Sequence, residues 1–180
     1  MHRPVEMLSD ADIDALCTYM VTQMAKLLEN EYLHWMAHKF VPLCDQADGS
    51  ITLFNARRGG KLARLTIANW LDAKCDVWLN TCNDRIDNMN EPDRMVFRQM
   101  KVMYQTGTGN RLVPFLVPLD TLAALDKLSD AEVHADCDVG LLSTNRYLFP
   151  STSQSTEHVY GWLTVHKVSP AAALDRPYLI

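Results

Sequence analysis

The stretch that decides the fold class of this chain is MVFRQMKVMYQTGTGNRLVPFLVPL, residues 95–119. Two runs rich in β-branched and aromatic residues, 95–104 and 112–117, flank the polar segment QTGTGN. Glycine and asparagine between two such runs are typical of a tight hairpin turn. We therefore predict an antiparallel β-hairpin whose strands pair between residues 101 and 117.

The N-terminal part of the sequence has helical patterns. Ser9 and Asp12 offer caps before apolar residues that recur every three or four positions up to about residue 30. A second helix, or a bent extension of the first, is expected over residues 32–43, where Pro42 would end it. The polar run that follows, residues 45–50, is expected to form a turn.

The region between this turn and the hairpin is more polar. Residues 51–71 have the apolar spacing of two helices, which are interrupted by Gly59 and Gly60. We expect a helix, a tight glycine turn and a second helix. Residues 72–92 carry several asparagines and are expected to form a partly ordered connection.

Three further elements are expected after the hairpin. An apolar face predicts a helix over residues 121–128, which would end before an acidic loop. Residues 147–150, with the sequence YLFP, are expected to form a short buried strand. Residues 157–168 are expected to form another helix.

These elements together predict a mainly α fold with one small antiparallel β-hairpin, an α+β class. We divide the chain into an N-terminal helical segment, 1–49, and a larger unit, 50–180. The length of 180 residues fits one domain, so both parts are expected to pack as one compact unit.

The composition is that of a folded globular protein, with 48% hydrophobic and 22% charged residues. No apolar run approaches the ~18 residues that cross a bilayer, and the N-terminus lacks the pattern of a signal peptide. The five cysteines are scattered and contain no CxxC pair, which favours reduced thiols. We expect an intracellular protein that does not engage a membrane and holds no metal or other cofactor.

The charge is uneven along the chain. The net charge of −5 has the wrong sign for a protein whose whole surface binds nucleic acid. Residues 50–70, however, contain four basic residues and no acidic one, whereas residues 120–138 contain six acidic residues and one lysine. Any contact with nucleic acid is therefore expected to be local.

The basic segment LFNARRGGKLARL, residues 53–65, lies between two predicted helices. It resembles the first active-site box of tyrosine recombinases, especially the eukaryotic Crypton-type subgroup. The resemblance implies that Arg58 faces the scissile phosphate of DNA, where a planar guanidinium can bind two oxygens at once. The basic residues expected to contact the DNA backbone beside it are Arg57, Lys61, Arg64, Lys101 and Arg111. From its residues alone, the segment also fits a basic turn on a solvated surface.

Further elements follow in the order of the same family. The RLVP sequence at 111–114 is similar to the second strand of the recombinase hairpin, YLFP at 147–150 to a family strand, and HVYGWL at 158–163 to a family helix. The resemblance covers residues 50–180 and implies the fold of the N-terminal half of a recombinase catalytic domain. The function it implies is DNA cleavage and rejoining during recombination or integration, without metal or nucleotide.

The sequence also departs from this family. Thr106 stands where the family has a hairpin lysine that acts as a general acid, and Lys61 replaces an acidic residue. No His-x-x-Arg box and no nucleophilic tyrosine follow in this sequence. We therefore expect an inactive or incomplete domain, derived from a transposable element, that binds DNA phosphates weakly in the nucleus and is not an enzyme by itself.

Two other interpretations remain open. The acidic balance also fits a domesticated recombinase-like domain that serves as a protein-interaction module, with protein partners or self-association. Glu31, His34 and His38 have a spacing that can bind metal on a helix, but no fourth ligand is evident and Trp35 beside them indicates packing.

Overall fold

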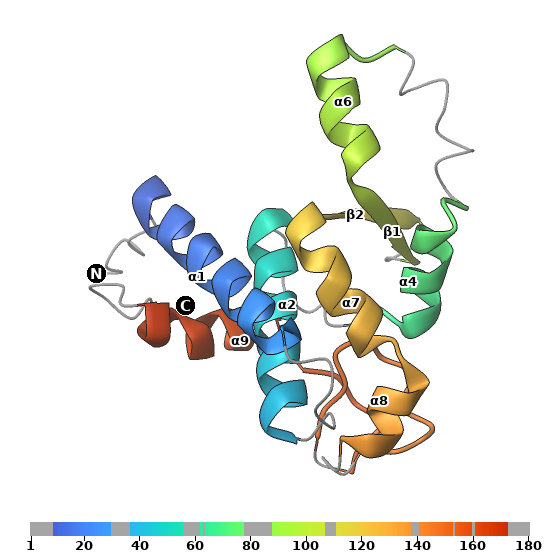
Figure 1. Cartoon of the computed structure of the whole chain (residues 1–180). Coiled ribbons are helices and arrows are strands. Elements are labelled where there is room, and N and C mark those ends of the chain that lie inside the picture. Colours follow the sequence, from blue (N-terminus) through green and yellow to red (C-terminus); the bar gives the residue numbers. More distant parts are fainter. Residues whose placement is uncertain are drawn as a thin grey trace, which may run out of the picture.

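Helices make up most of the described structure (Figure 1). The computed structural model describes residues 9–29, 37–55, 62, 64–77, 88–106, 111–137, 141–152, 154–159 and 161–172. The elements within these ranges are α1 (Asp10–Leu28), α2 (Ala37–Asn55), α4 (Ile67–Lys74), α6 (Glu91–Gln99), β1 (Lys101–Thr106), β2 (Leu112–Val117), η3 (Leu119–Thr121), α7 (Leu122–Leu128), α8 (Ala131–Asp136), α9 (Gly161–Val168) and η4 (Ser169–Ala172). The strands β1 and β2 form a two-stranded antiparallel sheet. The predicted α+β class is confirmed.

The hairpin is confirmed over its predicted length. Its register runs from Lys101, paired with Val117, to Thr106, paired with Leu112, and its tip at 107–110 lies outside the described residues.

The strand prediction for residues 95–99 is wrong, because these residues belong to helix α6. The sequence Glu91-Pro92 explains the difference, since an acidic residue and a proline both favour the first turn of a helix. An ion pair between Arg94 and Glu91 (3.3 Å) spans that turn. In Figure 1, α6 extends away from the body of the molecule.

Helix α1 confirms the first predicted helix. Ser9 and Asp12 form a capping box, in which Oγ of Ser9 accepts from the backbone N–H of Asp12 (3.2 Å) and the Asp12 carboxylate accepts from the N–H of Ser9 (3.1 Å). Leu16, Met20 and Met24 form its buried face.

Helix α2 differs from the prediction. It continues through Pro42 and through the polar run 45–50, for which the sequence predicts a turn. The expected division of the chain after residue 49 therefore falls inside a helix. Pro42 removes a single backbone donor. The polar run is mostly buried rather than solvated, because it faces other helices and finds polar partners on α9.

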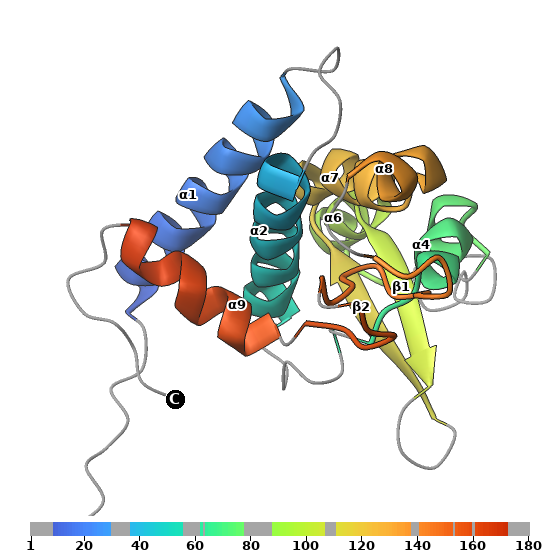
Figure 2. The same cartoon turned by 90° about the horizontal axis from the view of Figure 1, so that it is seen from below.

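Two glycines allow the neighbours of α2 to approach closely. A Cβ at Gly49 would lie 3.0 Å from Sδ of Met20 in α1. A Cβ at Gly161, the first residue of α9, would lie 2.2 Å from Oγ1 of Thr52. Figure 2 shows α1 and α9 beside α2. A small apolar cluster is buried there, made of Leu16, Met20, Val165 and Val168.

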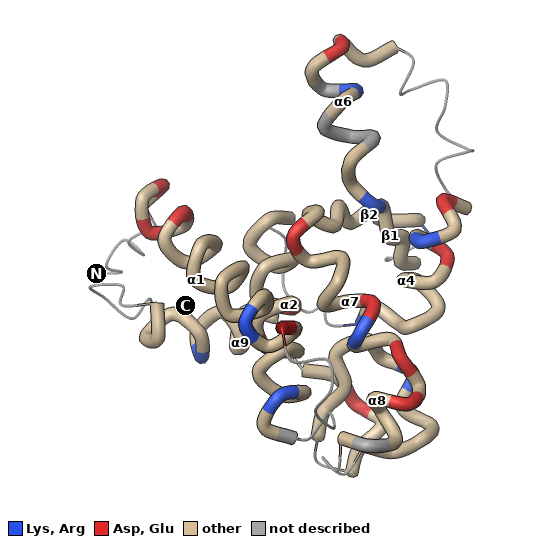
Figure 3. The backbone as a smooth tube through the Cα atoms, viewed as in Figure 1, with Lys and Arg blue, Asp and Glu red and all other residues tan. Residues whose placement is uncertain are grey.

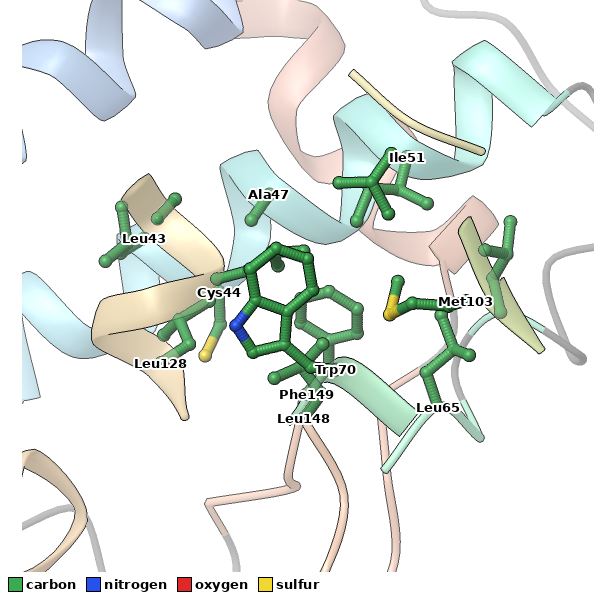
Figure 4. Packing of buried hydrophobic residues seen from close by; sticks show 14 of the residues in the cluster. Leu43, Cys44, Ala47, Ile51, Leu65, Trp70, Met103, Leu128, Leu148 and Phe149 are labelled. Carbon is green, nitrogen blue, oxygen red and sulfur yellow. The ribbon is translucent and has the colours of Figure 1, made fainter. Parts of the chain in front are cut away.

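The main core lies on another side of α2 (Figure 4). It contains residues from α2, α4, β1, α7 and the segment before α9, among them Leu43, Ala47, Ile51, Trp70, Met103, Leu128, Leu148 and Phe149. The Trp70 ring is buried, and its indole N–H donates to Oδ1 of Asp126 in α7 (3.1 Å). The same oxygen pairs with Nζ of Lys74 (2.7 Å), which ties α4 to α7.

The elements after the hairpin agree in part with the sequence. Helix α7 is confirmed, but the expected acidic loop contains helix α8, which Asp130 caps by accepting from the N–H of Glu132 (2.9 Å). Residues 147–150 are mostly buried and form isolated bridges rather than a regular strand. Helix α9 begins at Gly161, later than predicted. None of the described helices combines the length and apolar composition that a membrane crossing requires.

Asp48, in the middle of α2, is fully buried against α9. Its Oδ2 accepts a hydrogen bond from Oγ1 of Thr164 (2.9 Å). Within the described part of the chain, its Oδ1 and Oγ1 of Thr52, one turn later, have no hydrogen-bond partner. Burial raises the pKa of Asp48 to about 7, although the bond from Thr164 lowers it, and the carboxylate of Asp45 raises it further. The fold therefore favours the neutral carboxyl.

Ionisation of Asp48 is expected to destabilise the fold as pH rises. Its folded pKa is raised above the ordinary value of 3.8, so its contribution to stability is complete below that pH and is lost as pH rises through about 7. Asp48→Asn keeps the shape but cannot ionise. Between about pH 5 and about pH 8, the free energy of unfolding should fall by about 2 kcal/mol less in the variant than in the parent. Denaturant titrations at both pH values measure this difference, and equal losses in the two proteins would contradict it.

Candidate functional site

A polar pocket opens where the start of α4, the end of β1 and the segment 145–158 meet. It has a volume of about 530 Å³ and is open to solvent. The residues that line it are Arg64, Thr66, Asn69, Gln105, Thr106, Arg146, Tyr147, Glu157 and His158. All of these side chains carry a polar or charged group, so the pocket suits a polar or charged ligand.

A short backbone bridge pairs the two chain segments that carry the arginines of the pocket. Thr66 and Tyr147 form an antiparallel bridge just before α4. On one side of it, the N–H of Ile67 donates to the carbonyl of Arg146 (3.0 Å), and on the other side Leu148 donates to Leu65 (2.8 Å). Arg64 and Arg146 therefore come from adjacent backbone segments, although they are far apart in the sequence.

A second backbone bridge positions the part of the pocket wall that contains His158. Pro150 and His158 form an antiparallel bridge, with hydrogen bonds from Val159 to Phe149 (3.1 Å) and from Ser151 to Glu157 (2.9 Å). The bridge positions Glu157 and His158 opposite the start of α4.

Asn145 holds this loop from inside. Its side chain is buried, and its Nδ2 donates to the carbonyls of Ser155 and Glu157 (both 2.9 Å). Its Oδ1 accepts from the N–H of Tyr147 (3.0 Å). All three contacts are to backbone groups, so Asn145 fixes the path of the chain on both sides of the pocket.

Asn69 joins the helical wall of the pocket to the hairpin. Its Oδ1 accepts from the N–H and the hydroxyl of Thr66 (2.9 and 2.8 Å), which caps α4. Its Nδ2 donates to the carbonyl of Tyr104 in β1 (3.0 Å). The neighbouring Gln105 and Thr106 are thereby held at the rim of the pocket.

The arginines of the pocket differ electrostatically from several other basic residues. Within the described part of the chain, neither Arg64 nor Arg146 makes an ion pair, and both are exposed. Carboxylates pair with several other cations, those of Lys74, Arg94, Lys101 and Lys167. Figure 3 shows acidic residues on α1, α7 and α8. Glu157 is the acidic residue among those that line the pocket.

An aromatic pair supports one arginine. The rings of Tyr147 and His158 meet edge to face, with centroids 5.0 Å apart. The guanidinium carbon of Arg146 lies 5.8 Å from the centroid of the Tyr147 ring, within the range of a cation–π contact. Nδ1–H of His158 donates to the carbonyl of Val159 (2.9 Å). These contacts restrain three neighbouring side chains of the pocket wall.

The basic segment 53–65 is described only in part. The expected phosphate ligand Arg58, its neighbours Arg57 and Lys61 and the glycine turn lie outside the described residues. Asn55 is described, and its side chain both donates to the carbonyl and accepts from the N–H of Leu116 in β2 (both 2.9 Å). Arg64 lies in the pocket. The two ends of this segment are thus tied to β2 and to the pocket.

The two expected DNA contacts of the hairpin lie at its opposite ends. Arg111 is exposed and directly precedes β2, at the same end as Thr106. Lys101 begins β1, about 20 Å away by the rise of six strand residues. There its Nζ pairs with Oδ1 of Asp76 (2.7 Å) and donates to the carbonyl of Lys74 (3.4 Å). The structure brings Arg64 together with Thr106 and does not bring Lys101 to that pocket.

Several pocket residues were missed by the sequence analysis. Arg146 directly precedes the YLFP run that predicts a buried strand, and a basic residue beside such a strand was a usable signal. Tyr147 and His158 lay within segments matched to the recombinase pattern, but nothing in their spacing indicated that they face each other. The isolated bridges that join them have no sequence signature.

Comparisons of this chain with models of protein families, with curated proteins and with solved structures found no match. Two guanidinium groups that have no carboxylate partner among the described residues, surrounded by hydroxyl and amide groups, can bind an anion through charge-assisted hydrogen bonds.

Asn145→Ala is expected to loosen the loop that forms the pocket wall. The change removes three hydrogen bonds and leaves backbone groups unpaired, so the free energy of unfolding should fall by about 2–3 kcal/mol. Trypsin should also cleave after Arg146 faster than in the parent. Thr152→Ala, an exposed change in the same loop, is the control and should alter stability by less than about 0.5 kcal/mol. Similar stability and cleavage rates in both variants would contradict this role of Asn145.

Proposed function

We propose that this chain binds the phosphate backbone of DNA and is related to the catalytic domain of tyrosine recombinases, without the complete catalytic set. The observation that carries the proposal is the meeting of Arg64, from the recombinase-like segment 53–65, with Arg146 in one pocket. Guanidinium groups bind phosphate oxygens in a planar, bidentate manner. Two of them without ion-pair partners in the described chain are suited to a polyanion.

The nearby end of the hairpin supports the same function. Thr106 lines the pocket at the place where the resemblance puts the family's hairpin lysine. A threonine hydroxyl keeps its proton at neutral pH, so it can bind a phosphate oxygen but cannot act as a general acid. Arg111 adds an exposed cation at this end. The proposed function is therefore binding rather than strand cleavage, and a genomic DNA ligand makes the nucleus the proposed location.

The binding is expected to be weak and independent of sequence. Contacts to phosphates carry no base information, and each one contributes a slope of about −0.9 to the dependence of log affinity on log salt. The overall charge of −5 opposes a longer interface. Three described cations, Arg64, Arg111 and Arg146, would thus give a salt slope of about −2 to −3.

Replacing Arg64 or Arg146 by alanine should weaken duplex DNA binding several-fold at low salt. Each variant should also make the salt slope shallower by about 1, because one phosphate contact is lost. Lys26→Ala is the matched control, since it removes one exposed charge from α1, on the other side of α2 from α4 (Figures 1 and 2). Fluorescence anisotropy with labelled duplexes over a salt series measures both quantities.

The outcome decides between the two function classes. If Arg64→Ala and Arg146→Ala keep the affinity and slope of the parent, the pocket does not bind DNA phosphates. If the folded parent does not bind DNA even at low salt, the DNA-binding proposal fails and the interaction-module interpretation replaces it. Circular dichroism of each variant confirms that the comparison is made between folded proteins.

A further inference from the structure

We infer that the pocket takes a phosphate monoester, as found at a phosphorylated DNA end or on a phosphorylated small molecule, in preference to an internal phosphodiester. The inference deepens the proposed function and rests on it where the carrier is DNA. It follows from the shape of the pocket, from the number of donors that line it and from its charge.

The shape favours a projecting group. Arg64 and Arg146 line one concave volume, and the bridge between Thr66 and Tyr147 pairs the two backbone segments that carry them. A terminal phosphate extends from its carrier and can enter such a pocket. An internal phosphate of a duplex is flanked by a sugar on each side, so fewer of its oxygens can face the groups that line the pocket.

The number of donors favours a phosphate with more free oxygens. Each arginine can bind two oxygens through its planar fork. A monoester presents three strongly accepting oxygens, whereas an internal diester has one fewer because a second oxygen is esterified. The hydroxyl of Thr106, also in the lining, adds a further donor. The monoester therefore satisfies more of the donors at once.

The charge of the pocket points to the same ligand. The lining contains two arginines and one carboxylate, that of Glu157, so the net charge of its side chains is positive. A monoester carries a charge of about −1.5 to −2 near neutral pH, and a diester carries −1. A net positive site attracts the more highly charged anion more strongly. Glu157 can in addition accept a hydrogen bond from a hydroxyl group of the carrier.

The test compares duplexes of one sequence that carry a 5′-phosphate, a 3′-phosphate or only hydroxyl groups at their ends. In the parent, phosphorylated ends should bind about tenfold more tightly, because charge-assisted hydrogen bonds to the terminal group are added. In Arg64→Ala and Arg146→Ala, the ratio of the affinities for phosphorylated and hydroxyl ends should fall to about one. Arg111→Ala is the matched control, since it removes an exposed cation that is not among the pocket residues. This variant should bind all the duplexes more weakly and keep the ratio of the two affinities.

Three further measurements test whether the pocket recognises the monoester itself. Glu157→Gln removes the negative side chain of the lining and should raise the ratio. The ratio should fall below about pH 6, where a phosphate monoester loses its second charge. Ribose 5-phosphate, titrated as a competitor at constant ionic strength, tests whether the small carrier alone is sufficient.

The results separate this inference from the proposed function. Equal affinities for phosphorylated and hydroxyl ends, with binding still lost in Arg64→Ala, would overturn the inference and leave DNA-backbone binding in place. Binding of ribose 5-phosphate without any binding of DNA would support the monoester site and overturn the DNA function. If the protein binds neither DNA nor ribose 5-phosphate, both the proposed function and this inference are overturned.

Discussion

The packing of α2 on two sides is the constraint on which the other elements depend. Apolar residues such as Ala47 and Ile51 face the main core, while Asp48 and Gly49 face α9 and α1. Polar groups buried on a helix cannot be hydrated, so the neighbouring helices must supply their partners. The hydroxyl of Thr164 is one such partner, and its helix is thereby fixed in rotation against α2. The segment that leads into α9 forms one wall of the pocket, so the core and the site share this requirement.

Side-chain amides give the pocket its shape in the absence of extended strand pairing. Asn55 joins the end of α2 to β2, Asn69 joins α4 to β1, and Asn145 joins the two sides of the loop before α9. An asparagine has both donor and acceptor groups, so one residue can link two backbone segments that do not run in register. The pocket is therefore formed by irregular segments that a few asparagine hydrogen bonds fix in place. The helices and strands around these segments pack directly against one another.

The sequence predicted the elements whose signals are local. The hairpin follows from the turn residues between its strands, and α1 follows from the capping pair Ser9 and Asp12. The polar run 45–50 could not be recognised as helix, because its composition indicates solvent exposure and its partners on α9 are distant in sequence. Arg64 was found from the clustering of charge, whereas Arg146 was missed because an isolated bridge brings it to the site. Local chemistry is visible in a single sequence, and the pairing of distant irregular segments is not.

The close approach at Gly161 links the proposed binding to the packing of α9, through a residue that is not among those lining the pocket. Any side chain there would meet the hydroxyl of Thr52 and push the start of α9 away from α2. His158 lies three residues earlier and would move with it. In a mutational scan scored by ligand binding, Gly161 would therefore rank among the contact residues. Substitutions that lower ligand binding in such a scan would therefore include residues that pack behind the pocket wall as well as residues that line the pocket.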